Sequence, residues 1–333
     1  MSRAVGIRQV AEHAGVSIGT VSNAINRPEM VSAKMLALVQ ATMDELGFVR
    51  NDLARQVRMG GGTTLGMIVL NVENPFFAAL SNACEAAAEQ NGFSVVLGSS
   101  SQVPEREDRY LDLFEGQRVE GLLVAPVDGV TDRMRKLHRH GMPFVLFDPD
   151  AAVPGFCTVA MDGEAGARLA VSHLLESGRN RLAFVGGPLH QVRDRWRGAV
   201  EEVGRHPGST IRRIDTIDQN VQDGLAVGEA ILREPPERRP DGIFAATDLI
   251  AIGIMQALLS APGVRVPEDV ALIGYDDISQ ASTAIVPLTT IRQPTAELAR
   301  AALSLVLTER EEGVDHEHQH ALLAPALVRR RSA

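Results

Sequence analysis

From residue 63 onward, short apolar runs alternate along the chain with longer segments of helical periodicity. The apolar runs, each bounded by turn residues, are 65–70, 93–97, 121–125, 144–147, 182–185, 243–246 and 270–274. The helical segments expected between them are 75–91, 105–117, 164–177, 221–233 and 249–260. Strands that are apolar throughout are typical of parallel sheets covered by helices on both faces. Because these units are too many for one sheet, we expect two α/β lobes.

The N-terminal segment has a different pattern, with helical periodicity alone. Its first apolar residues, within 7–14, recur at the i, i+3, i+4, i+7 spacing of one helix face. Ser17 is expected to cap a second helix that runs to Asn26, and Ser32 to cap a third that ends at Gly47. Three helices in so short a segment, with a tight turn between the first two, are typical of a helix-turn-helix domain.

The second of these helices has a core face and a mostly polar face. The side chains expected to point inward are Thr20, Val21, Ala24 and Ile25. Those expected to point outward are Ser17, Ile18, Gly19, Ser22 and Asn23. Such a face can enter a DNA major groove, where asparagine can bond bidentately to adenine and isoleucine can contact a thymine methyl group. The residues alone leave one alternative, an ordinary three-helix subdomain with a solvated face.

The charge is unevenly distributed along the chain. Residues 1–60 carry seven Arg or Lys side chains against five Asp or Glu, a formal charge of +2. The whole chain has a formal net charge of −9, so the remaining residues are acidic. An anionic partner such as DNA is therefore expected to bind the N-terminal segment.

Several motifs together resemble the LacI/GalR family of bacterial transcriptional regulators, from about Ile7 to about Arg330. They stand in the family's order at 7–26, 44–48, 51–55, 74–77, 184–188, 274–277 and 287–294. The resemblance implies a helix-turn-helix head, a hinge helix and a two-lobed α/β core similar to periplasmic binding proteins. It also implies a repressor that binds a palindromic operator as a homodimer, with no enzymatic activity and no cofactor. Its effector is expected to be a sugar or sugar derivative, although purine-binding relatives share the fold.

The resemblance also implies domain boundaries. The expected parts are a DNA-binding head at 1–50, a hinge helix and linker at 51–62, and an effector-binding and dimerisation core at 63–333. Within the core, the first lobe is expected at about 63–160 plus 290–318, and the second at about 161–289 plus 319–330.

The family's DNA contacts map onto the head and the hinge. The matching residues are Ser17, Ile18, Gly19, Thr20, Ser22, Asn23, Asn26, Asn51, Ala54, Arg55 and Val57. In the family, paired hinge helices fold on the operator and push apolar side chains into a central minor-groove step. Val57 takes the place of the usual leucine, Asn23 that of a frequent arginine, and Gly6 that of a frequent helix-capping threonine.

The family's effector contacts map onto the core. The matching residues are Asn74, Phe76, Phe77, Asp148, Gln191, Arg195, Thr247, Asp248 and Asp276. These residue types suit a polyol, because carboxylates accept bonds from vicinal hydroxyls, arginine donates to them, and phenylalanine covers the apolar face of a sugar ring. Asn74 could instead be only a helix cap. Many members have an aromatic residue near position 219, so here either Trp196 turns inward or the pocket is more polar.

Other features of the sequence exclude several classes of protein. Cys84 and Cys157 are far apart and lack metal-ligand spacing, so both are expected to be buried core residues. His316, His318 and His320 alternate, and an exposed loop is favoured there over a metal site. No nucleophile–base set, secretory signal or membrane-spanning run is visible, and a cytoplasmic location is expected.

Overall fold

The computed structural model of the chain describes residues 5–48, 62–148, 153–188 and 190–333, without the side chains of residues 190 and 191. The chain divides into two compact units, one up to Gly62 and the other from Thr63 to Ala333. No described helix is long and apolar enough to cross a membrane.

The first unit contains the three expected helices. They are α1 (Ile7–Ala14), α2 (Ile18–Asn26) and α3 (Ala33–Glu45), with a 3-10 turn at Pro28–Met30. Val10, Val21 and Val39, one from each helix, are fully buried against one another in its core. Helix α1 starts without a side-chain N-cap at Gly6, but Gln9 supplies a substitute. Its side-chain oxygen accepts a hydrogen bond of 2.8 Å from the Gly6 backbone N–H, which is half of a capping box.

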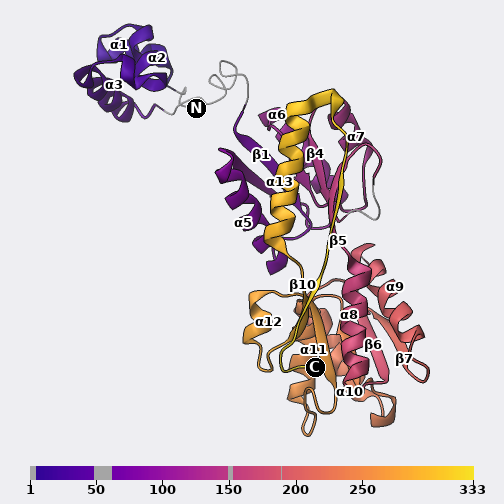
Figure 1. Cartoon of the computed structure of the whole chain (residues 1–333). Coiled ribbons are helices and arrows are strands. Elements are labelled where there is room, and N and C mark those ends of the chain that lie inside the picture. The colour runs from indigo at the N-terminus through magenta and orange to yellow at the C-terminus, as the bar shows by residue number, and fades with distance from the viewer. Residues whose placement is uncertain (1–4, 49–61, 149–152, 189) are drawn as a thin grey trace. The chain divides into compact units, whose positions relative to one another are not determined.

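The second unit contains two six-stranded sheets (Figure 1). All five strand pairs of the first sheet are parallel, in the order β11 (His320–Leu323), β5 (Cys157–Met161), β4 (Phe144–Phe147), β3 (Leu122–Val124), β1 (Thr64–Val69) and β2 (Ser94–Ser99). The second sheet has the order β12 (Ala326–Val328), β10 (Thr289–Arg292), β9 (Ala271–Asp276), β8 (Gly242–Ala245), β6 (Arg181–Gly186) and β7 (Thr210–Asp215). Only the β10–β12 pair among these is antiparallel.

Helices cover both faces of each sheet, as the continuous apolar strands predict. The first sheet is flanked by α5 (Pro75–Gln90), α6 (Pro104–Gln117), α7 (Asp132–Arg139) and α13 (Thr295–Glu312). The second sheet is flanked by α8 (Gly163–Glu176), α9 (His190–Gly204), α10 (Val221–Arg233), α11 (Asp248–Ser260) and the short α12 (Ser279–Thr283). The remaining 3-10 turns are Pro236–Arg238 and Gly313–Asp315.

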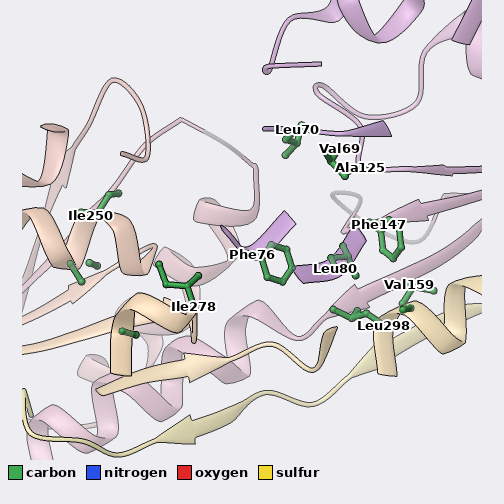
Figure 2. Close-up of a cluster of buried hydrophobic side chains, with 14 of the residues drawn as sticks. Val69, Leu70, Phe76, Leu80, Ala125, Phe147, Val159, Ile250, Ile278 and Leu298 are labelled. Carbon is green, nitrogen blue, oxygen red and sulfur yellow. The ribbon is translucent and has the colours of Figure 1, made fainter. Parts of the chain in front are cut away.

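The alternation of side chains along each strand explains this arrangement. In β1, Met67 and Val69 belong to the same buried cluster as residues of α5 and α13. Ile68, between them, belongs to the cluster that contains residues of α6 and α7. Successive side chains of a strand point to opposite faces, so an entirely apolar strand can be buried only between two layers of helices. Figure 2 shows part of the first cluster, where Leu80 and Leu298 face Phe147 and Val159.

The chain crosses between the two sheets three times. It leaves the first sheet after β5, returns after β10, and leaves again after β11. The lobe boundaries expected near 290 and 319 therefore need correction. Strand β10 (Thr289–Arg292) pairs with β9 in the second lobe, and β11 (His320–Leu323) pairs with β5 in the first. The pairing of these short strands decides where each crossover lies, and the sequence pattern does not contain that information.

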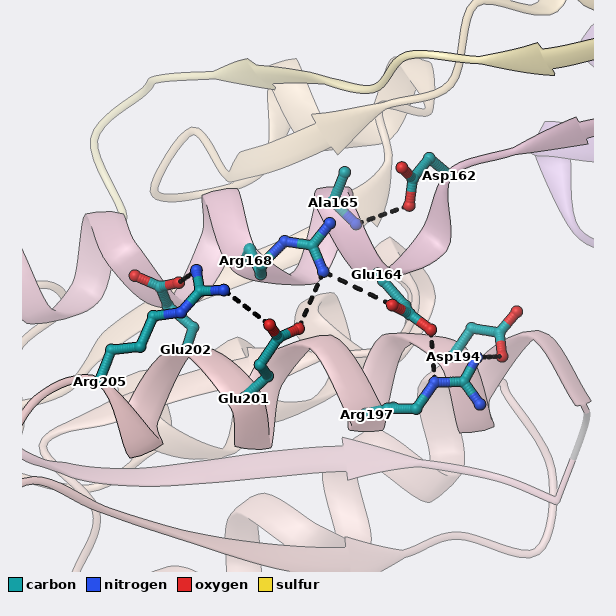
Figure 3. Close-up of polar contacts among 9 residues, drawn as sticks. All are labelled: Asp162, Glu164, Ala165, Arg168, Asp194, Arg197, Glu201, Glu202 and Arg205. Carbon is teal, nitrogen blue, oxygen red and sulfur yellow. Dashed lines mark hydrogen bonds and ion pairs between the residues drawn. The ribbon is translucent and has the colours of Figure 1, made fainter.

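Ion pairs run between the facing helices α8 and α9 on the surface of the second lobe (Figure 3). Arg168 pairs with Glu201 at 3.1 Å, and Arg205 pairs with the same glutamate at 2.6 Å. Exposed pairs of this kind contribute only about 0–1 kcal/mol each. Close backbone approach matters more, because a Cβ on Gly198 of α9 would lie 2.3 Å from the Glu164 carbonyl oxygen of α8. Glycine at this position lets the two helices pack closely.

Candidate functional site

The outward face of α2 is largely exposed. Ser17, Ile18, Gly19, Asn23 and Asn26 are exposed, and Thr20 and Ser22 are half-buried. The Ser17 hydroxyl oxygen accepts a bond of 3.0 Å from the Thr20 backbone N–H and so caps α2. Ile18 has 45% of its surface exposed, which is unusual for a large apolar side chain so close to a domain core. The face therefore combines polar donors and acceptors with one exposed apolar side chain.

The predicted hinge contacts Asn51, Ala54, Arg55 and Val57 lie outside the described residues. Their role stays a prediction from the resemblance.

A cavity that is partly open to solvent is lined by residues of both lobes of the second unit. Its polar lining consists of Asn74, Asp148, Arg195, Gln219, Thr247, Asp276 and Gln293, and its aromatic lining of Phe76, Phe77 and Phe147. Several of these residues follow the carboxyl ends of strands. Asp148 follows β4, Thr247 follows β8, and Gln293 follows β10. Ligand sites of open α/β sheets lie at these strand ends.

Arg195 is the one arginine or lysine among the described residues that line the cavity. Its guanidinium lies over the Tyr275 ring, with Cζ 3.6 Å from the ring centroid, and one N–H donates to the Ala246 carbonyl oxygen. The side chain is buried, yet Nε has no hydrogen-bond partner among the described residues. A buried donor costs free energy when it is unpaired. A ligand oxygen in the cavity would give this guanidinium a further partner.

Asp276 closes β9 at the same cavity. It adopts a positive φ of 113° and is buried. One carboxylate oxygen accepts a bond of 2.7 Å from the Gln293 amide. Burial raises the pKa of Asp276 to about 6, although Arg195, Gln293 and Asn74 lower it. The site thus holds a carboxylate and a guanidinium close enough to influence each other, both shielded from water.

Asn74 and Thr247 each have two roles at the cavity. The Asn74 side chain caps α5 by accepting a bond of 3.0 Å from the Phe76 backbone N–H. The Thr247 hydroxyl caps α11 by accepting from the Ile250 backbone N–H at 3.3 Å. The capping alternative considered for Asn74 is therefore confirmed, and it does not remove the residue from the cavity.

The other predicted contacts differ in how they meet the cavity. Phe76 is buried and Phe77 half-buried, with ring centroids 5.2 Å apart. The Asp148 carboxylate accepts a bond of 2.8 Å from the Met161 backbone N–H, which holds it at the cavity wall. Gln191 lies in α9, but its side chain is outside the described part of the chain.

Asp248, one of the predicted effector contacts, does not line the cavity. Its side chain is fully buried beneath the cavity wall, and both carboxylate oxygens have partners. One accepts a bond of 2.6 Å from the Thr290 hydroxyl, and the other accepts from the Ile278 backbone N–H at 2.9 Å. Burial raises the pKa of Asp248 well above its usual value. The residue links α11 to β10 and to the loop before α12, so its role is structural.

Trp196 is a core residue and does not turn into the cavity. Its ring packs against Phe184 with a centroid distance of 5.5 Å, in the cluster between α9 and the second sheet. Gln219 and Gln293 line the cavity instead, and neither was among the predicted contacts. Gln219 stands where the family often has an aromatic residue, so it was a visible candidate. Gln293 follows a short strand that the sequence pattern does not reveal.

The exposed loop expected around the three histidines is found at 316–319, but the expected exposure is wrong for His316 and His318. His316 is buried with 8% of its surface exposed, His318 is half-buried, and only His320 is exposed. The His316 Nε2 atom lies 3.1 Å from the Sγ atom of fully buried Cys157. Parallel pairing of β11 with β5 brings these residues together.

Each of the two units matches a known protein family. Residues 6–51 match the family described as bacterial regulatory proteins, lacI family, and residues 171–333 match the periplasmic binding protein-like domain. The ribose operon repressor of Escherichia coli (strain K12) is 33% identical over 98% of this chain and 99% of its own length.

Two solved structures are similar to the chain. The lac repressor dimer bound to operator and the anti-inducer ONPF superposes with a TM-score of 0.80 at 28% identity, over 99% of each chain. A LacI family transcriptional regulator from Enterococcus faecium with bound ribose has a TM-score of 0.72 at 27% identity, over 81% of this chain and 98% of that one.

Proposed function

Because the chain belongs to the LacI family of bacterial regulatory proteins, we propose that it represses transcription from a pseudo-palindromic operator as a homodimer and responds to a small sugar. The observation that carries the proposal is the presence of buried Arg195 and buried Asp276 in one cavity between two lobes, in a chain with an exposed helix-turn-helix face. The relatives that the chain matches are repressors and not enzymes.

In the proposed complex, α2 lies in the major groove of each half-site. Its exposed residues Ser17, Ile18, Gly19, Asn23 and Asn26, with half-buried Thr20 and Ser22, supply the contacts to bases and phosphates. The exposed Ile18 suits a thymine methyl group, and Asn23 suits an adenine. The expected hinge contacts Asn51, Ala54, Arg55 and Val57 belong to the same proposal. The operator-bound lac repressor dimer supports this mode of binding, because it is similar to this chain over 99% of its length.

Asn23→Ala is expected to weaken operator binding about 10- to 100-fold, since a bidentate base contact contributes about 1–3 kcal/mol. The loss should be confined to one base pair of each half-site, and the salt dependence of binding should stay unchanged because no phosphate contact is removed. Fluorescence anisotropy on operators varied at single positions measures both. Gln40→Ala, exposed on α3, is the matched control. An equal loss on every operator variant would contradict the assignment.

Val57→Gly is expected to weaken operator binding at least tenfold, on the order of what loss of an intercalated apolar side chain costs. Sugar binding should not change, because Val57 lies in the expected hinge and outside the second unit. Fluorescence anisotropy with operator DNA and calorimetry with sugar measure the two affinities of the variant and of the wild type. Unchanged operator affinity would refute the hinge assignment.

The cavity lining favours a sugar over a purine base. Two carboxylates, Asp148 and Asp276, line the cavity together with the guanidinium of Arg195. Three amides line it as well, those of Asn74, Gln219 and Gln293. The oxygens of this set can accept hydrogen bonds from several hydroxyls, and its N–H groups can donate hydrogen bonds to the same hydroxyls. Phe77 and its neighbour Phe76 provide an apolar wall for a ring face. Of the remaining predicted contacts, Asn74 and Thr247 line the cavity and stay in the proposed site. Gln191 stays a prediction from the resemblance, and Asp248 is not included.

Isothermal titration calorimetry on the full chain tests the ligand class. D-ribose is the first sugar to titrate, because the similar repressor and the similar ribose-bound structure name it. Other pentoses and guanine complete the set. We expect a pentose to bind and guanine not to bind. Binding of guanine alone would overturn the sugar assignment and leave the operator assignment standing.

Sugar affinity is expected to fall as the pH drops below about 6, where Asp276 becomes protonated. A protonated carboxyl loses acceptor capacity for sugar hydroxyls. The expected loss of sugar affinity is not caused by unfolding of the protein on protonation of Asp276. Its pKa is raised on folding, so its protonation between about pH 4 and 6 stabilises the folded state. Calorimetry at pH 5 and pH 7.5 tests this. Asp276→Asn should bind weakly at both values, and a wild-type affinity independent of pH would contradict the role of Asp276.

The proposed regulation couples the cavity to the head. Sugar bound between the lobes would favour one relative arrangement of the lobes and thereby change operator affinity. Such couplings are typically about 1–3 kcal/mol, or roughly 5- to 150-fold in affinity. Operator anisotropy with and without saturating sugar measures the coupling and its sign.

A further inference from the structure

A compact cluster of metal-binding residue types lies in the first lobe. The potential ligand atoms of Cys157, Glu309, His316 and His318 all lie within 4.8 Å of one another. Cys157 begins β5, at the amino end of the sheet. The cavity described above lies at the carboxyl ends of the strands, so this cluster is a separate feature.

The topology explains why distant residues meet here. Strand β11 pairs in parallel with β5, with His320 opposite Thr158. The residues just before β11 therefore run past Cys157, and the Gln319 backbone N–H donates to its Sγ atom at 3.4 Å. Glu309 comes from the last turns of α13, which ends at Glu312 shortly before this segment. The last turns of α13 and the residues just before β11 therefore both lie next to the Cys157 thiol.

The two thiol–imidazole distances are close to those of a tetrahedral zinc site. Cys157 Sγ lies 3.1 Å from His316 Nε2 and 3.9 Å from His318 Nδ1. Zinc bonds of about 2.3 Å to sulfur and 2.0 Å to nitrogen place tetrahedral ligand atoms about 3.5 Å apart. Shifts of a few tenths of an ångström would bring these atoms to that separation.

The Glu312 carboxylate contacts the His316 imidazole from outside the cluster. The Nδ1 atom of His316, the one turned away from Cys157, lies 2.7 Å from the Glu312 carboxylate. Ligating histidines in metal sites have this arrangement, in which a carboxylate holds the other ring nitrogen. Glu309 is held by two contacts, at 2.6 Å to His138 Nε2 and at 3.2 Å from the Phe144 backbone N–H.

We propose that this cluster binds one Zn²⁺ ion, with Cys157, His316 and His318 as ligands and the Glu309 carboxylate as the fourth. Thiolate and imidazole donors favour zinc over magnesium or calcium, which prefer oxygen ligands. Binding replaces the Cys157–His316 contact and releases the thiol proton to solvent. Cys157, Glu309 and His316 are buried, which fits a closed structural site. The ion ties the end of α13 and the start of β11 to β5.

The test uses the untagged full-length chain, stripped of metal with a chelator and titrated with Co²⁺ and then Zn²⁺. We expect one Co²⁺ per chain, a thiolate-to-cobalt charge-transfer band in the near ultraviolet, and intense visible bands typical of tetrahedral geometry. Zn²⁺ should displace Co²⁺ and raise the melting temperature. Cys157→Ser should lose the charge-transfer band. Cys84→Ser, which changes the only other cysteine, should keep it.

Two further variants separate a metal site from a purely structural cluster. Glu312→Gln changes an exposed carboxylate and should weaken Zn²⁺ binding about 10- to 100-fold without preventing folding. His318→Gln changes a half-buried ligand and provides the ligand test if Cys157→Ser does not fold. His320→Ala should retain full affinity, since His320 instead contacts the Thr158 hydroxyl. Absence of the charge-transfer band in the wild type, or a band that persists in Cys157→Ser, would overturn the proposal.

Discussion

Replacing Arg195 with methionine is expected to weaken sugar binding roughly 100-fold, because charge-assisted hydrogen bonds contribute about 1.5–3 kcal/mol each and Arg195 can make more than one. Methionine keeps the apolar stem but removes the only cation among the described cavity-lining residues. It also removes an interaction that lowers the pKa of Asp276, so more of that carboxyl would be protonated at neutral pH. Both effects lower the affinity of the cavity for a polyol. Calorimetry with the tightest-binding sugar measures the change.

Arg197→Met is the matched control for this experiment. Arg197 lies on the same helix, but its side chain is 63% exposed and pairs with Glu164 and Asp194 on the surface. This variant should bind sugar as the wild type does. The Arg195 variant also loses a donor to the Ala246 carbonyl oxygen, so its melting curve must be recorded beside its affinity. A folded Arg195→Met protein with wild-type sugar affinity would contradict the assignment of the cavity.

Gly253→Ala is expected to destabilise the second lobe by about 3 kcal/mol, at the upper end of the usual cost of overpacking. A Cβ at Gly253 of α11 would lie 2.1 Å from the Val221 carbonyl oxygen and 2.7 Å from the Leu225 backbone nitrogen, both in α10. These are backbone atoms, so the helices themselves must separate. The shift in the urea midpoint reports the effect, and it should be largest in signals from the second lobe.

The opposite result is expected at a second helical glycine. Gly116 lies in α6, is exposed, and has nothing within 4 Å of a Cβ built on it. Gly116→Ala should therefore stabilise the chain, by up to about 1 kcal/mol from helix propensity. The same substitution at the two glycines should thus change the free energy of unfolding in opposite directions. If Gly253→Ala were as stable as the wild type, the close packing of α10 and α11 would be wrong.

The apolar pattern predicted β2 at one sheet edge as well as most of the buried strands, but it missed the buried strand β5 and also β7, β10, β11 and β12. The expected runs near 65–70, 144–147 and 243–246 coincide with β1, β4 and β8 within a residue or two. Strand β7 (Thr210–Asp215) was not singled out, because only Ile211 and Ile214 in it are apolar. The short strands β10 and β11 were also missed, and with them the positions of two crossovers. Their place depends on tertiary pairing, which leaves little trace in local sequence.

The candidate site was predictable to the extent that family motifs mark it. Arg195, Asp276 and Phe77 line the cavity as the resemblance implied. Asp248 does not, because the sequence cannot show that a threonine hydroxyl and a backbone N–H already occupy its carboxylate. Gln293 lies within the recognised motif at 287–294, but the motif alone did not show that its side chain reaches the cavity.

The cysteine–histidine cluster escaped sequence analysis for a different reason. Cys157 and His316 are 159 positions apart, so no ligand spacing connects them. Only the parallel pairing of β11 with β5 brings them within contact distance. Three alternating histidines were visible, but the burial of His316 and the proximity of a thiol are properties of the folded sheet.

Selection of bound duplexes from a randomised DNA pool tests the central claim, that the chain is an operator-binding regulator controlled through its cavity. The purified full-length protein is used at low salt, alone and with each sugar that binds in calorimetry. We predict enrichment of a pseudo-palindrome with two equivalent half-sites. Its affinity should fall steeply with salt concentration, because binding releases counterions from the phosphates, and should change on addition of sugar. If no sequence is enriched under either condition, or if the enriched operator is insensitive to every bound sugar, the claim is contradicted.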